Sequence, residues 1–218
     1  MRRLSSGMWR QCVTGLVVLA AATVVLGVVY PAVVWGLSRV TTTSAEGSVI
    51  HDVNGCAAGS SAIGVDVRPP AGAPDPYLHG RVTGGLDDPL APGDPSVSAA
   101  SDLGPNSTLL RDVVTARRAA VAAREGVDPA AVPADAITGS ASGLDPHISP
   151  RYAALQAPRL ARTNGLSESR VREIIAAHTS GRRFGVLGAP RVDVLAVNLA
   201  LGHRVPGCRR GSTTTPGR

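Results

Sequence analysis

The stretch VTGLVVLAAATVVLGVVYPAVVWGL, residues 13–37, is an unbroken apolar run bounded by Arg10 and Arg39. A helix of about 25 residues, at about 1.5 Å per residue, is about 37 Å long and exceeds the roughly 30 Å hydrocarbon core of a bilayer. No other stretch of the sequence is as long and as apolar. The sequence therefore predicts one transmembrane helix, residues 11–37, that crosses the lipid bilayer once.

The charges beside this helix predict its orientation. Arg2, Arg3 and Arg10 precede it and no acidic residue does, whereas Arg39 is soon followed by Glu46. Because basic residues are retained in the cytoplasm, we expect residues 1–10 there and residues 41–201 in an extracytoplasmic domain. A cleaved signal peptide is the alternative, but the apolar run is about twice the usual length and no clean cleavage site follows it. An uncleaved, single-pass anchor in the cell membrane is favoured.

The charged residues argue against two classes of function. The formal net charge is +6, and every cationic side chain is arginine, since the sequence has no lysine. These arginines are scattered in a chain with one Phe, so the basic–aromatic patch of a nucleic-acid-binding protein is missing. The phosphate-binding loop G-x-x-x-x-G-K-[ST] needs a lysine. If ATP is involved, we expect another chain to hydrolyse it.

The three cysteines are too few for a disulfide scaffold. Cys12 lies at the membrane edge, Cys56 in a Gly-rich loop and Cys208 in a C-terminal tail. Cys56 and Cys208 could pair outside the cell, but these locations favour free thiols. No C-x-x-C or H-x-x-x-H spacing indicates a metal, so we expect neither a metal nor a bound cofactor.

The region after the helix is long enough for one modest domain. Two short strands are predicted at residues 48–50 and 62–65, with the tight-turn pair Asn54-Gly55 between them. Residues 68–106 are dense in Pro, Gly, Asp and Ser, which is typical of a loop. The domain therefore begins with a hairpin and continues through a long irregular segment.

Capping residues and apolar periodicity predict the helices. The first begins near Ser107 and ends at Gly126. The second begins at Ser149 and ends at Gly165, and Pro158 should bend or break it.

The third helix runs from the cap Ser167 towards Gly181, with His178 on its apolar face. Residues 192–199 then resemble a buried strand, and residues 202–218 an unstructured, basic tail. This mixture predicts a small α+β domain rather than alternating βαβ units.

The densest polar cluster is SASGLDPHIS, residues 140–149. Asp145, His147 and a serine suggest a hydrolase, but no G-x-S-x-G elbow is present to expose a nucleophile. Asp145-Pro146 is a turn former and Ser149 a helix cap, so a structural role is favoured. A membrane-anchored hydrolase and ion coordination remain as alternatives.

The same cluster carries a family resemblance. TGSASGLDPHISP, residues 138–150 (hereafter the signature segment), closely resembles the signature of the C subunit of the Kdp potassium-transporting ATPase. Weaker matches follow in the expected order at residues 29–31, 46–48, 59–64, 77–81, 103–106, 156–161, 185–188 and 191–201. The resemblance assigns a structural or partner-contact role to Ser140, Ser142, Gly143, Leu144, Asp145, Pro146, His147 and Ser149.

The resemblance implies a non-catalytic accessory subunit of a high-affinity potassium uptake pump. Its partners would be a channel-like potassium-translocating subunit, a P-type ATP-hydrolysing subunit and a very small membrane peptide. The family is described as a chaperone that raises the ATP affinity of the catalytic subunit. An extracytoplasmic domain faces away from the nucleotide, so assembly and stabilisation are favoured, and any effect on ATP would pass through conformational coupling.

The sequence departs from the family pattern at residues 65–67, at Leu78, after Arg81 and at residues 99–102. These positions lie in the loop-rich part of the domain. They bear on contacts with the translocating subunit more than on the fold. A stand-alone scaffold or adhesion domain is a further alternative to the subunit role.

Overall fold

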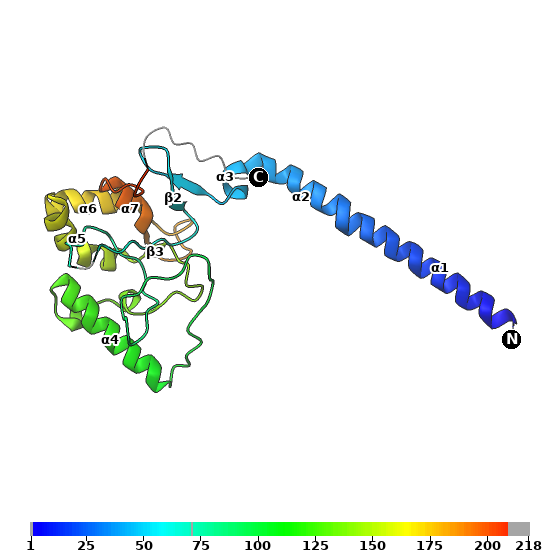
Figure 1. Ribbon diagram of the computed structural model, residues 1–218, viewed down its shortest axis with the longest axis horizontal. Helices are drawn as coiled ribbons and strands as arrows, with labels where there is room; N and C mark the ends of the chain where they lie inside the picture. Colours follow the sequence, from blue (N-terminus) through cyan, green and yellow to red (C-terminus); the bar gives the residue numbers. More distant parts are fainter. Residues whose placement is uncertain (1, 71, 209–218) are drawn as a thin grey trace. The chain divides into compact units, whose positions relative to one another are not determined.

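The computed structural model describes residues 2–70 and 72–208, which fall into two compact units, residues 1–48 and 49–218. The first unit is a continuous helical rod (Figure 1) that contains α1 (Arg2–Val24), the π-helical turn η1 (Val25–Val29) and α2 (Tyr30–Ser38). The 3-10 turn η2 (Arg39–Thr41) and the short α3 (Thr42–Ala45) complete it. Residues 7–45 form the one helix of the described chain that is long and apolar enough to span a membrane. The predicted long apolar helix is thus confirmed, and it extends beyond the predicted residues 11–37 at both ends.

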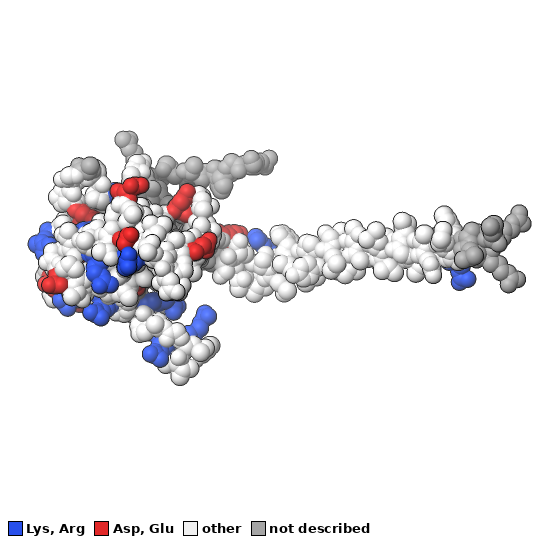
Figure 2. Space-filling model, turned by 90° about the horizontal axis from the view of Figure 1, so that it is seen from below, with Lys and Arg blue, Asp and Glu red and all other residues white. Residues whose placement is uncertain are grey.

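The π-turn has a local cause. Pro31 lacks the amide hydrogen that would pair with the carbonyl four residues earlier. The turn before it widens, and the Tyr30 amide donates to the Val25 carbonyl instead. Figure 2 shows the rod as an almost uncharged surface with charged residues near its ends, whereas both signs of charge intermingle over the domain.

The domain begins with an antiparallel hairpin of β1 (Val49–His51) and β2 (Ala57–Ser60). The predicted turn is present, with Gly55 at a φ of +85°. The predicted second strand at residues 62–65 is wrong, because the chain returns immediately after the turn. The observed second strand, β2, has the sequence AAGS. These residues have low strand propensity, so the sequence did not predict a strand there.

Three longer helices follow: α4 (Thr108–Glu125), α5 (Pro150–Asn164) and α6 (Glu168–Ala177). The predicted caps are confirmed. Ser107, Ser149 and Ser167 each accept a hydrogen bond from the amide three residues later, and Gly126 and Gly165 end their helices with left-handed φ values. Short 3-10 turns, η3 (Pro129–Ala131) and η4 (Ala134–Ala136), lie between α4 and α5.

The predicted break at Pro158 and the predicted helix end at Gly181 are wrong. The helix α5 runs through Pro158 without a break. Ala154, whose carbonyl Pro158 leaves without its usual amide partner, lies on the exposed side of the helix, where that carbonyl is open to solvent. Apolar residues on both sides of Pro158 are buried, and their packing outweighs the lost bond. The helix α6 ends at His178 rather than Gly181, because the chain then enters a strand.

A second small sheet contains β3 (His147–Ile148), β4 (Thr179–Ser180) and β5 (Arg191–Asp193), in the antiparallel order β3-β5-β4. The helix α7 (Val194–Ala200) follows β5 directly. The strand predicted at residues 192–199 is therefore mostly helix, because the Asp193 carboxylate caps it by accepting from the Ala196 amide at 2.9 Å. The architecture is α+β, as expected.

The core lies among α4, α5, α6, α7 and the three-stranded sheet. Its fully buried members include Val121, Tyr152, Leu160, Val171 and Val192. The structure assigns no helix or strand to the described residues of the segment 68–106, yet Leu78 is completely buried there. This irregular segment is therefore part of the core, and side chains from the helices hold it in place.

The expectation of free thiols at Cys56 and Cys208 is wrong, since a disulfide joins them. The chain after α7 folds back over the domain, where the Val205 amide donates to the Asp52 carboxylate at 3.1 Å. The first part of the predicted tail, residues 202–208, is thus fixed to the hairpin, whereas residues 209–218 lie outside the described residues. This pairing spans 152 residues of sequence, so no local pattern indicated it.

Candidate functional site

The signature segment begins with a turn whose polar groups bind one another. The Ser140 and Ser142 hydroxyls are 2.9 Å apart, and the Leu144 amide donates to the Ser142 hydroxyl at 3.2 Å. Gly143 has a φ of +72°, and a Cβ there would lie 2.8 Å from the Ala99 carbonyl oxygen. A side chain at position 143 would therefore be both strained and crowded, which explains the glycine.

The Asp145-Pro146-His147 part forms a second turn. One Asp145 carboxylate oxygen accepts from the His147 amide at 3.0 Å and lies 3.3 Å from His147 Nδ1. The other oxygen is 3.4 Å from Arg81 Nη1. Arg81 also donates to the Thr138 and Gly139 carbonyls, so it connects the start and the middle of the segment to the loop that carries it.

Ser149 connects the segment to α5. Its hydroxyl caps the helix by accepting from the Tyr152 amide at 3.0 Å and donates to Asp135 at 2.9 Å. The Ser149 amide donates to the same carboxylate at 2.7 Å. The start of α5 is thus fixed from both sides.

Neighbouring elements approach the segment through their backbones. The Gly64 amide donates to the Leu144 carbonyl at 2.8 Å, and a Cβ on Gly64 would lie 2.7 Å from the Asp145 carbonyl oxygen. The Val194 amide donates to the Pro146 carbonyl at 3.2 Å. Ile148 pairs with Val192 in the central strand. The segment therefore joins the residues after the hairpin, the sheet and α5.

This geometry does not form a catalytic triad. Ser140 and Ser142 are hydrogen-bonded to each other, and Ser149 is bonded to Asp135 and the helix start. In residues 2–70 and 72–208, no hydroxyl of the segment is hydrogen-bonded to the imidazole of His147. Asp145 and His147 are brought together as the hydrolase interpretation requires, but the nucleophile is missing from the pair.

A cavity of about 420 Å³ lies beside the segment, between Gly143, the loop around Ala99 and the Leu110 side of α4. Arg117 from α4 contributes to its lining and is itself buried, donating to the Gly84 and Ile137 carbonyls. Burial of Arg117 lowers the pKa of its guanidinium. The described carbonyls thus satisfy this cation without an acidic partner.

A larger buried network, which the sequence reasoning missed, holds residues 75–79, hereafter the inner segment. Two amide side chains bind its backbone in pairs of hydrogen bonds. Gln156 of α5 accepts from the His79 amide at 2.9 Å and donates to its carbonyl at 3.0 Å. Asn198 of α7 does the same for Leu78, at 2.7 and 2.9 Å. These side-chain amides satisfy the backbone N–H and C=O groups of Leu78 and His79, as a neighbouring β-strand would do in a sheet.

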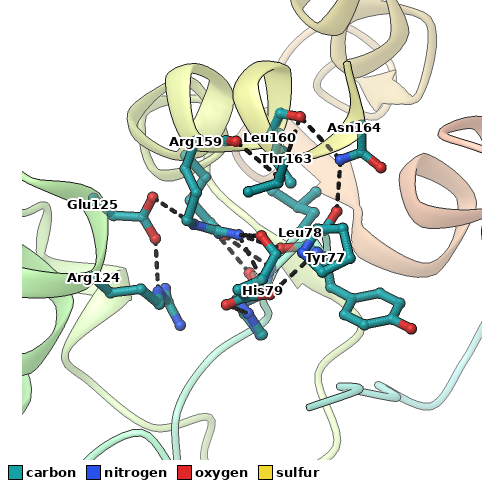
Figure 3. A network of polar contacts seen from close by, with 12 residues as sticks. Tyr77, Leu78, His79, Arg124, Glu125, Arg159, Leu160, Thr163 and Asn164 are labelled. Carbon is teal, nitrogen blue, oxygen red and sulfur yellow. Dashed lines mark hydrogen bonds and ion pairs between the residues drawn. The ribbon is translucent and has the colours of Figure 1, made fainter. Parts of the chain in front are cut away.

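Arg159 is the centre of this network (Figure 3), where it points from α5 between Glu125 and the inner segment. Its guanidinium donates to Glu125 at 3.0 Å and to the Asp75 and Tyr77 carbonyls at 2.7 and 3.0 Å. Arg124 binds the other oxygen of Glu125 at 2.7 Å. All buried side-chain polar atoms in the described part of the chain have hydrogen-bond partners.

His79 lies between two carboxylates, 2.8 Å from Asp66 and 2.6 Å from Asp75. Burial alone would lower the pKa of His79, but hydrogen bonds to these two acids outweigh it and raise the pKa above its ordinary value. Burial likewise opposes ionisation of Asp75, yet its bond to His79 and the nearby Arg159 lower its pKa. With both ring nitrogens facing carboxylates, the imidazolium form fits this position.

The sequence does contain one indication of this network: Gln156 and Asn198 are polar residues on otherwise apolar faces of their helices. Both fall within matches to the family pattern, at residues 156–161 and 191–201. Their partners lie 77 and 120 residues away, in a segment with no periodicity, so their roles were not readable from spacing.

One group of potential metal ligands exists among the described residues, namely Asp52, Cys56 and Cys208. The two sulfurs form a disulfide, and Asp52 accepts three backbone amide hydrogens. Burial would raise the pKa of Asp52, but these amide bonds lower it. This group stabilises the hairpin and the C-terminal segment and does not fit a metal.

Known proteins match this chain over most of its length. The family model for the K+-transporting ATPase, c chain, matches residues 12–203. The potassium-transporting ATPase KdpC subunit of Kineococcus radiotolerans is 44% identical over 204 residues, covering 90% of this chain and 95% of the relative. Those of Koribacter versatilis and Rhodopseudomonas palustris are 39% and 43% identical over 202 residues, covering 91% and 85% of this chain and 97% and 93% of the relatives. Because one match includes both the membrane helix and the domain, the chain belongs to the KdpC family of K+-transporting ATPase subunits.

Proposed function

We propose that this chain is the non-catalytic accessory subunit of an ATP-driven potassium uptake complex. The names of its relatives, potassium-transporting ATPase subunits, support the potassium pump. The single candidate membrane helix supports an anchored subunit. The chain assembles and stabilises the complex, and the transport and the ATP hydrolysis belong to its partners.

The observation that carries the accessory role is the use made of the polar groups in the signature segment. Ser140 and Ser142 bind each other, Ser149 caps α5, and Asp145 joins His147 to Arg81. A site that performs chemistry needs at least one reactive group directed at a substrate. Side chains that satisfy one another suit a rigid surface for partners instead.

The disulfide supports an extracytoplasmic domain. Disulfides persist in oxidising compartments and are rare in the cytosol. The Cys56–Cys208 disulfide therefore favours an extracytoplasmic domain. The basic residues Arg2, Arg3 and Arg10 favour the same topology, because they keep the N-terminus in the cytoplasm. These two arguments are independent of each other.

The partners proposed are the potassium-translocating subunit, the P-type ATP-hydrolysing subunit, the small membrane peptide and the surrounding lipid. In this arrangement ATP binds another chain, and the domain lies on the other side of the bilayer from it. Any increase in ATP affinity then acts through conformational coupling. By linkage, ATP would strengthen the binding of this subunit by the same factor.

Co-purification tests the proposal. The tagged full-length chain is expressed with its partner subunits, and we expect two larger membrane proteins to be recovered with it. ATP turnover and growth at low potassium should require the chain, whereas the purified chain alone should hydrolyse no ATP. Recovery as a stable monomer from cells that make the partners would contradict the proposal.

A further inference from the structure

The loop between β4 and β5 exposes apolar side chains. Phe184 is 85% exposed, Val186 72% and Leu187 59%. Phe184 is the only phenylalanine of the chain. Single exposed apolar residues are ordinary, but here three occur within four positions of one loop.

The backbone of this loop is ordered by its own hydrogen bonds. Arg183 and Leu187 exchange a pair of bonds, both at 2.9 Å, and the Gly185 amide donates to the Arg182 carbonyl at 3.2 Å. Phe184 has a φ of +54°, a left-handed conformation that costs free energy for a bulky residue. The loop thus keeps its aromatic side chain outward in a strained but fixed geometry.

The base of the loop is equally rigid. It leaves the sheet at Ser180 and returns at Arg191, next to Val192, which is fully buried at the centre of the sheet. Asp193 then caps α7. A loop fixed to a rigid core is a common way to present binding residues.

The charges within the loop and at its base have one sign. Arg182, Arg183 and Arg191 lie within it or at its base, and no acidic residue occurs between Glu173 and Asp193. In the described chain neither Arg182 nor Arg183 forms an ion pair. An occupant that complements this surface offers an apolar pocket with carboxylates at its rim.

We propose that residues 182–187 dock into an apolar, acid-rimmed pocket on the extramembrane surface of another subunit of the same complex. This inference rests on the proposed accessory function and names its contact surface. A pre-organised aromatic flanked by arginines has the composition of a binding hot spot. Tryptophan and tyrosine, the usual residues at a lipid interface, are absent from the loop, which favours a protein over the bilayer.

A photo-crosslinking residue at position 184 tests the inference in the full complex in native membranes. The same residue at Val53, 67% exposed at the tip of the hairpin, is the control. We expect irradiation to join position 184, and not position 53, to a partner subunit identified by mass spectrometry. Capture of lipid alone, or of nothing, at position 184 would overturn the inference.

Matched serine variants give a second readout. Val186→Ser and Val53→Ser remove the same side chain from similarly exposed positions, and neither should change the unfolding temperature. We expect Val186→Ser to raise the dissociation rate of the chain from the complex by about tenfold, and Val53→Ser by less than about twofold. Equal rates for the two variants would contradict the docking role.

Co-purification of the wild-type chain separates the two claims. If the wild-type chain recovers its partners but position 184 captures no subunit, the docking inference alone fails. If the wild-type chain recovers no partners, the accessory function fails and the docking inference fails with it.

Discussion

Side chains help to hold both the inner segment and the signature segment, but in different surroundings. Residues 75–79 are bound by Gln156, Arg159 and Asn198, each at most 5% exposed, and Leu78 and His79 of this segment are buried. Residues 138–150 include partly exposed polar side chains: Asp145, His147 and their neighbour Arg81 keep between a quarter and a third of their surface in contact with solvent. The polar side chains of the conspicuous sequence string are thus partly exposed, whereas the side chains that bind the less conspicuous one are buried.

The segment that is easiest to recognise in the sequence is therefore not the one that we expect to contribute most to the free energy of unfolding. Hydrogen bonds and ion pairs at half-exposed positions contribute little, because water competes for the same groups. Buried groups have no such replacement, and removing one partner leaves the others unsatisfied. We therefore expect the stability of the domain to depend on the inner segment, and the signature segment to matter chiefly for the surface it presents.

Arg159→Ala should have the largest effect. It leaves Glu125 without one of its two arginine partners and the Asp75 and Tyr77 carbonyls without theirs, so we expect a loss of about 3–5 kcal/mol in the free energy of unfolding. Denaturant unfolding of the purified full-length chain measures it. Arg162→Ala, at an exposed position of the same helix, is the control and should cost less than about 0.5 kcal/mol. Similar losses for the two variants would contradict the central role of Arg159.

Cys56→Ser tests the covalent support of the inner segment. The disulfide holds the C-terminal residues, whose His203 binds the Pro76 carbonyl at 3.0 Å and stacks near Tyr77. We expect a loss of about 2–4 kcal/mol. A reductant should lower the unfolding temperature of the wild-type chain and leave that of the variant unchanged. Cys12→Ser, outside the domain, is the control. An unfolding midpoint of Cys56→Ser equal to that of the wild-type chain would show that the disulfide is not needed for stability.

The pH dependence of unfolding tests the charges in the inner segment. A histidine with a raised pKa contributes fully below its ordinary value of 6.5, and the contribution is lost as pH rises through the folded value. Asp75, with a lowered pKa, contributes above 3.8, and its part is lost as pH falls through the folded value. The cluster should therefore stabilise most between these two values. His79→Gln should remove the decline on the alkaline side, and an unchanged pH profile would refute the assignment.

His147→Ala should have the smallest effect. In the described structure Asp145 is the one ionic partner of the His147 imidazole, and both side chains are partly exposed, so we expect a loss below about 1 kcal/mol. The same unfolding assay measures it, beside Arg159→Ala. A loss as large as that of Arg159→Ala would reverse the contrast between the two segments.

Local features of the fold were predictable from the sequence. The membrane helix follows from one apolar run, and Ser107, Gly126, Ser149 and Gly165 mark helix ends because capping involves only neighbouring residues. The strand predicted at residues 192–199 failed because a short apolar run does not distinguish strand from buried helix. Asp193 at its start was the cap that decides for helix.

Long-range features were not predictable in the same way. The signature segment was found from its sequence, and its turns and its cap at Ser149 follow from Asp, Gly and Ser at known positions. The disulfide and the two amides that bind the inner segment depend on contacts 77 to 152 residues apart. A segment without periodicity gives no sign of being buried, so Leu78 and His79 were classed with the loop.

Labelling of an introduced cysteine tests the central claim, a rigid domain outside the cell, most directly. Val97→Cys, at a 53% exposed position, is made in a Cys12→Ser background and treated in intact cells with a small maleimide that does not cross the inner membrane. We predict that position 97 reacts before lysis, while the cysteines of the disulfide remain protected. Reaction only after lysis would place the domain beside the nucleotide in the cytoplasm and contradict the account.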